Sequence, residues 1–178
     1  MTASPFFSEE HEAFRDQLRR FVAEEVRPNA DAWEAAGEIP RAVFRRMGEL
    51  GFLGVRYPEE YGGAGMDTIS YCLAIEEVSR VCATSGVILS VNNSLVCDPL
   101  LKFGTEEQKR RYLPRLAGGA LSAFALTEKD VGSDPANMST TAVLSDDGSH
   151  WILNGEKLWT TNGPRAEIII VMARTPAP

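Results

Sequence analysis

The sequence has 178 residues, of which 44% are hydrophobic and 24% are charged, and its formal net charge is −7. This composition is typical of a globular protein with one domain, or with one domain and part of another. No basic patch is dense enough to follow a phosphate backbone, so nucleic acid is not an expected partner.

Targeting and redox signals are sparse. The N-terminal residues lack a basic region followed by an apolar run, so no signal peptide is expected. No apolar stretch reaches the roughly 20 residues that a membrane-spanning helix needs. Cys72, Cys82 and Cys97 lack C-x-x-C spacing, which favours reduced core thiols over a disulfide framework or a zinc site. We therefore expect no metal centre and a cytoplasmic location.

The first two thirds of the sequence are predicted to be helical. Apolar residues at helical spacing predict a helix over residues 9–33, with Ser8 as its N-cap. Further helices are predicted over residues 40–47, 68–81 and 85–103, and a glycine-rich loop over residues 51–65. A capping box at residues 105–108 opens a helix that ends near Ala117. An N-terminal all-α helical bundle domain over residues 1–119 is predicted.

After Gly118-Gly119 the pattern changes to short β-rich segments. Strands are predicted over residues 120–127, 139–145, 150–155 and 167–174. Residues 146–149 predict a hairpin turn, and Asn154-Gly155 predicts another, because Asn-Gly suits a type I′ turn. The fold class is therefore α+β. Residues 120–178 are predicted to be the start of an incomplete middle domain, an antiparallel β-barrel or β-sheet.

The stretch beyond Asn154-Gly155 carries the first chemical signal. If it is a strand, the side chains of Lys157, Trp159 and Thr161 share one face. An indole and a hydroxyl on one face suit a flat heteroaromatic ring with a hydrogen-bond acceptor at its edge. The plainer alternative is a core Trp, with a Thr chosen for its β propensity.

The second signal is the stretch "FALTEKDVGSD", residues 124–134. A polar loop containing Gly132 and Ser133 follows a predicted strand that ends at Thr127. Glycine lets the backbone approach a ligand, and loop N–H groups with a hydroxyl can hold an anion such as pyrophosphate. The alternative is an ordinary surface loop.

Together, "ALTEKDVGSD" and "LNGEKLWTTNG", after a helical domain, closely resemble the acyl-CoA dehydrogenase family. The resemblance covers nearly the whole chain, including "PEEYGGAGMD" and "LLKFGTEEQKRRYLP". "LSVNNSL" is most similar to the short-chain or butyryl-CoA members. The sequence departs from the family at Lys129, where Pro is usual, at Val131, where Ala is usual, and at Thr160, where Ile is common.

The resemblance implies FAD as cofactor, bound by residues of both motifs: Phe124, Leu126, Thr127, Gly132, Ser133, Trp159 and Thr161. By resemblance, Thr161 donates a hydrogen bond to flavin N5 and Trp159 packs against the ring. Thr127 bonds the pyrimidine end, and Gly132 and Ser133 approach the pyrophosphate. Donors fixed where charge develops on a flavin lower the barrier to hydride transfer.

The resemblance also implies an acyl-CoA substrate. Ser133 would meet the CoA arm, and Val87, Val91 and Leu95, at helical spacing, would form walls of the acyl pocket. Plain core packing is the alternative for each of these apolar residues.

In the family, the catalytic base is a glutamate of a C-terminal helical domain, and no residue here matches it. No catalytic residue is therefore predicted, and the chain is expected to be an inactive N-terminal fragment. The family implies an electron-transferring flavoprotein as acceptor and a homo-oligomer, a dimer or tetramer, when complete. Two alternatives stay open: an acyl-CoA oxidase-type relative, and a non-catalytic helical interaction module or regulatory half-subunit. The apolar strand 167–174 predicts self-association of the isolated chain.

Overall fold

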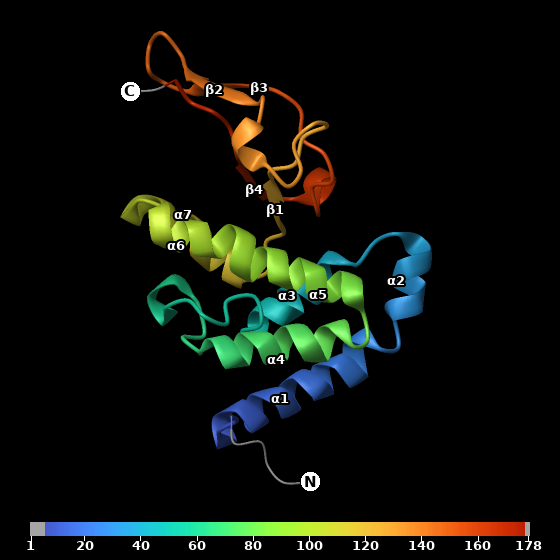
Figure 1. Cartoon of the computed structure of the whole chain (residues 1–178). Coiled ribbons are helices and arrows are strands. Elements are labelled where there is room, and N and C mark those ends of the chain that lie inside the picture. Colours follow the sequence, from blue (N-terminus) through green and yellow to red (C-terminus); the bar gives the residue numbers. More distant parts are fainter. Residues whose placement is uncertain (1–5, 177–178) are drawn as a thin grey trace.

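The computed structural model describes residues 6–176, with helices first and strands after them (Figure 1). The helices are α1 (Glu9–Phe21), α2 (Ala30–Ala36), α3 (Arg41–Glu49), α4 (Thr68–Ser79), α5 (Ala83–Ser90), α6 (Asp98–Phe103) and α7 (Glu106–Ala117). The strands are β1 (Ser122–Ala125), β2 (Thr141–Leu144), β3 (Trp151–Asn154) and β4 (Ile168–Val171). The strands lie together beyond α6 and α7, away from α1. This order confirms the predicted α+β class.

The predicted caps are confirmed, but the first predicted helix is too long. Ser8 and Thr105 each form a capping box. Helix α1 continues as a π-helical segment, Val22–Val26, and the helix then breaks before α2. Pro28 lies in this break and has no N–H to continue a helix. The prediction of one long helix relies on apolar spacing alone and does not take this proline into account.

The long helix predicted over residues 85–103 is three segments, because a π-helical segment, Val91–Cys97, separates α5 from α6. This segment turns Asn92 and Asn93 into the interior, where both are buried. Asn93 donates to the carbonyls of Phe52 and Leu89 and accepts from the Val55 N–H. The first part of the glycine-rich loop, residues 52–55, is therefore buried, and the Asn93 amide satisfies two of its main-chain groups.

The hairpin β2–β3 is antiparallel, and Gly148, with φ of +69°, lies in its turn, as predicted. The other pair differs from prediction, because β1 and β4 pair in parallel. The hairpin and the irregular residues after it connect these two strands, which lets β4 run alongside β1 in the same direction. The second predicted hairpin turn, at Asn154-Gly155, is wrong: no strand follows it until β4.

Two apolar clusters fix the helices and the β1–β4 pair. The first includes Phe14 and Phe21, whose rings meet the Phe52 ring edge-on at centroid distances of 5.7 and 5.5 Å. The second is built on the π-helical segment Val91–Cys97, called the π-helical segment from here on, together with α7 and the buried Tyr57. Phe124 of β1 packs against this second cluster, as do Ile168 and Ile170 of β4. Strand β1 is therefore held against the helical residues of the second cluster.

Candidate functional site

Most of the predicted site residues meet around one cavity of about 270 Å³, which we call the β1 pocket. Its lining comes from the π-helical segment, β1 and the residues after it, and the stretch before β4: Val91, Leu95, Phe124, Leu126, Thr127, Leu158, Trp159 and Thr161. Segments far apart in the sequence therefore converge at the end of β1, where the two motifs predicted a site.

A main-chain hydrogen bond joins the two motifs at the pocket. The Leu158 N–H donates to the carbonyl of Thr127 at 2.8 Å. Thr127 lies two residues after the end of β1, and β1 packs against the helices, so the position of the first motif is fixed by the strand. The Leu158–Thr127 hydrogen bond then fixes the second motif relative to the first. The lining is apolar apart from the hydroxyls of Thr127 and Thr161 and the indole N–H of Trp159.

Trp159 reaches the pocket by a different route from the one predicted. Residues 157–161 form no strand, so the argument that alternate side chains share a face is wrong. Trp159 instead has a left-handed backbone, with φ of +56°, and its side chain is 89% exposed. A bulky side chain in this region is strained, and such strain gathers at functional sites. The indole is thus presented to solvent beside the pocket.

Lys157 does not share a face with Trp159 but points inward. Its ammonium lies 2.8 Å from a carboxylate oxygen of Glu128 and donates to the Leu126 carbonyl at 3.0 Å. Glu128 also accepts hydrogen bonds from Ser139 and Thr140. The Lys157 ammonium, followed by the Ser139 and Thr140 donors, holds the pKa of Glu128 well below its usual range. This ion pair is not predicted by the sequence pattern, although both residues belong to the two motifs.

Gly132 and Ser133 lie outside the β1 pocket, in the exposed loop between β1 and β2. A reciprocal pair of main-chain bonds between Glu128 and Val131, of 3.0 and 3.2 Å, closes the base of this loop. A Cβ atom on Gly132 would meet nothing within 4 Å, so no protein group approaches it closely. Their predicted role beside a pyrophosphate stays a prediction.

The three predicted acyl-pocket residues separate. Val91 and Leu95 line the β1 pocket, and Val91 also packs in the second apolar cluster. Val87 does not line the pocket, and it is 51% exposed on α5. The prediction that all three side chains share one face of a helix is therefore confirmed only for Val91 and Leu95, which lie in the π-helical segment. Val87 lies one turn earlier, in α5.

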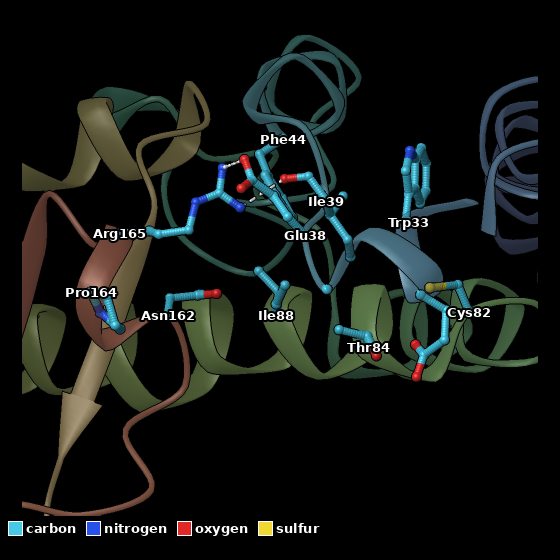
Figure 2. Close-up of a pocket in the computed structure, with 12 residues that line it drawn as sticks. Trp33, Glu38, Ile39, Phe44, Cys82, Thr84, Ile88, Asn162, Pro164 and Arg165 are labelled. Atoms are coloured by element: carbon cyan, nitrogen blue, oxygen red, sulfur yellow. Dashed lines mark hydrogen bonds and ion pairs between the residues drawn. The ribbon is translucent and has the colours of Figure 1, made fainter. Parts of the chain in front are cut away.

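A larger cavity, of about 450 Å³, lies elsewhere, between the helices and the segment before β4 (Figure 2). It contains none of the predicted site residues. At its edge Arg165 pairs with Glu38 at 2.7 Å and donates to the Ile39 carbonyl at 3.1 Å, as Figure 2 shows. Nearby, Arg41 pairs with Glu167 at 2.7 Å. These pairs join the helical part to the segment before β4. Because the larger cavity contains none of the predicted residues, the β1 pocket is the candidate functional site.

Within residues 6–176, no group of three or more His, Cys, Asp or Glu side chains could hold a metal ion. In the same range, no helix is long and apolar enough to cross a membrane. The cysteines there are all free. The expectation of core thiols holds for Cys97, which is buried, but is wrong for Cys72, which is exposed.

Comparisons with known proteins identify the same family over both parts of the chain. Residues 8–120 match the family "Acyl-CoA dehydrogenase, N-terminal domain", and residues 123–178 match "Acyl-CoA dehydrogenase, middle domain". The chain is 44% identical to "Probable acyl-CoA dehydrogenase YngJ" of Bacillus subtilis, covering 94% of this chain and 44% of that one. It is also 44% identical to the mitochondrial "Short-chain specific acyl-CoA dehydrogenase" of Bos taurus, over 94% and 40%.

A solved structure agrees with the fold. The glutaryl-CoA dehydrogenase of Mycobacterium smegmatis, in complex with FADH2, superposes with a TM-score of 0.90 at 38% identity. The match covers 96% of this chain and 44% of that one. The chain thus spans less than half the length of each of these relatives.

Proposed function

This chain belongs to the acyl-CoA dehydrogenase family, and from that premise we propose that it forms the flavin- and acyl-facing part of an FAD-dependent acyl-CoA dehydrogenase. The observation that carries the proposal is the β1 pocket, where both sequence motifs and the π-helical segment meet. We further propose a helical domain over residues 1–119 and a middle β-domain over residues 120–178.

The pocket suits a flat, partly polar ring. The exposed Trp159 offers an aromatic face, and Thr127 and Thr161 offer hydroxyls beside it. In the proposed complex, Trp159 packs on the isoalloxazine ring. Thr161 donates a hydrogen bond at N5, and Thr127 bonds the pyrimidine end. Bound FAD supplies the acceptor for the hydride that leaves the acyl β-carbon.

The acyl thioester is proposed to lie along the apolar part of the same pocket, against Val91, Leu95 and Phe124. These side chains are apolar and add no charge, which suits an acyl chain. The lining within the described residues contains no Asp or Glu, so we propose that the base that removes the α-proton comes from outside this pocket lining. We propose an electron-transferring flavoprotein as acceptor and a homo-oligomer as the complete assembly.

The test is an FAD titration of the chain followed by visible absorbance, with Trp159→Ala and Thr161→Val as variants. A saturable, perturbed flavin band near equimolar FAD, weakened at least tenfold in both variants, is expected. A chain that stays folded and leaves the flavin spectrum unchanged would refute a cradle formed by these residues alone. In a separate measurement the bound FAD is reduced with dithionite, and reoxidation by oxygen faster than that of free reduced FAD, with peroxide produced, would identify an oxidase instead of a dehydrogenase.

A further inference from the structure

Two buried, oppositely charged side chains hold the motifs together behind the β1 pocket. The side chains of Glu128 and Lys157 are 5% and 9% exposed, and their charged atoms lie 2.8 Å apart. Neither lines the pocket. We propose that this ion pair is a positioning device, which fixes the Leu126-Thr127 backbone against residues 157–161 and so sets the affinity for FAD. The inference rests on the function proposed above.

The contacts of Lys157 act on consecutive peptide groups. Its ammonium donates to the Leu126 carbonyl at 3.0 Å, and the next residue, Leu158, donates its N–H to the Thr127 carbonyl at 2.8 Å. Two neighbouring carbonyls of the first motif are therefore held by two neighbouring residues of the second. Rotation of either segment would break both bonds, so the pair fixes the orientation of Thr127 in the pocket wall.

Glu128 extends the same network to the start of β2. One carboxylate oxygen accepts from the N–H and hydroxyl of Ser139, both at 2.6 Å, and the other accepts from the Thr140 N–H at 2.9 Å. A buried carboxylate with these donors and an ammonium is fully compensated, whereas removal of Lys157 leaves its charge unmatched. The local structure then has to open to hydrate that charge.

This network also accounts for the strained Trp159. A left-handed backbone at a bulky residue persists only where its surroundings hold it firmly. Trp159 is 89% exposed and gains little from its own packing. Lys157 and Leu158 anchor the chain before Trp159. Asn162, which donates to the Ser122 carbonyl at 3.0 Å, anchors it afterwards. The ion pair and the Leu158 main-chain bond therefore hold one of the two flanks that keep the indole at the pocket.

The test uses the full chain and the variants Lys157→Met and Glu128→Gln. Lys102→Met, an exposed lysine of α6, is the matched control. One measurement is the FAD dissociation constant from flavin fluorescence. A second, which needs no FAD, is amide hydrogen exchange at Leu158 compared with the amides of α7. A third is the ¹⁹F signal of Trp159 in protein labelled with 5-fluorotryptophan.

For Lys157→Met we expect FAD affinity at least tenfold weaker, Leu158 exchange at least tenfold faster and a shifted Trp159 signal, with α7 exchange unchanged. Glu128→Gln acts in the same direction, and the double variant is no worse than the worse single variant, because the two groups act as a unit. Lys102→Met changes none of these.

Unchanged Leu158 exchange would overturn the positioning role. So would exchange that rises equally in Leu158 and α7, since this would mean a general loss of stability. Failure of the wild-type chain to bind FAD would instead refute the proposed cradle, whereas the exchange data would still decide whether the pair fixes the pocket wall. The two failures are therefore separate.

Discussion

Replacing the buried amide of Asn93 by alanine is expected to destabilise the chain severely. Asn93 is 2% exposed, and it satisfies the Val55 N–H at 3.1 Å and the Phe52 carbonyl at 3.0 Å. Each buried group left unpaired costs about 1–3 kcal/mol, so two cost about 2–6 kcal/mol. A loss near 3 kcal/mol corresponds to a fall in Tm of roughly 6–12 °C for a chain of this size.

Asn92→Ala provides the internal comparison. Asn92 donates to the carbonyls of Leu53 and Leu116, but Tyr57 Oη also donates to Leu53 at 2.7 Å and the Gly119 N–H to Leu116 at 3.2 Å. Both carbonyls stay bonded in the variant, so its main orphan is the Ser122 hydroxyl, which had donated to Asn92. We expect Asn92→Ala to cost about 1–2 kcal/mol, clearly less than Asn93→Ala.

Urea unfolding followed by circular dichroism, with thermal melts, measures both variants. Ser94→Ala is the control, because its hydroxyl only adds a bond to the helical carbonyl of Ser90. If Asn93→Ala lost under 1 kcal/mol, or no more than Asn92→Ala, the reasoning from unpaired loop groups would be refuted.

Three further predictions concern the strands and the pocket. The left-handed backbone of Trp159 costs about 1–2 kcal/mol, and Trp159→Gly removes this strain, so the flavin-free variant is expected to have a higher Tm while its FAD binding is weaker. Trp159→Ala keeps the Cβ atom, so a thermal melt should show no increase in Tm. Hydrogen bonds, first from the Ser145 hydroxyl, lower the pKa of Asp147 from 3.8 to about 2. Because the pKa of Asp147 is lower in the folded state, its carboxylate stabilises the β2–β3 turn fully above about pH 3.8, and this stabilisation is lost as the pH falls toward 2. Hydrogen-exchange protection of the hairpin amides is therefore expected to fall between these pH values in the wild type and not in Asp147→Asn. Finally, exposed Trp151, Ile152 and Ile169 favour self-association of the isolated chain, and a monodisperse monomer in sedimentation velocity would contradict this.

Signals confined to a few neighbouring residues predicted the structure well. The capping box at Thr105 and the turn around Gly148 depend on hydrogen bonds between residues at most five apart, so a short stretch of sequence is enough to predict them. The strand segments were also predicted, because β-rich runs are bounded by turn residues. Most of the residues singled out by the motifs and the resemblance line the β1 pocket, whereas Val87, Gly132 and Ser133 lie outside it, and the roles of all of them toward FAD and acyl-CoA stay predictions.

Features that depend on distant partners were not predictable in this way. The alternation rule placed Lys157 and Trp159 on one face, but Lys157 is drawn inward by Glu128, a partner that periodicity cannot identify. Similarly, Asn93 gave no helical or strand signal of its own, because its role depends on a loop that folds against it from elsewhere. The parallel pairing of β1 with β4 is likewise set by the path of the intervening chain.

The pairing of β1 with β4 has a consequence for the order of folding. Among the strands of residues 6–176, β1 pairs only with β4, and the hairpin β2–β3 lies between them in the chain, so β1 has to wait for β4 to be synthesised before it can pair. The helices, by contrast, make many of their contacts with near neighbours in sequence, as α4 does with α5. Contacts between distant residues form late, because closing the loop between them costs entropy. During synthesis the helical part can therefore fold first, and Trp159 and Thr161 complete the pocket only later.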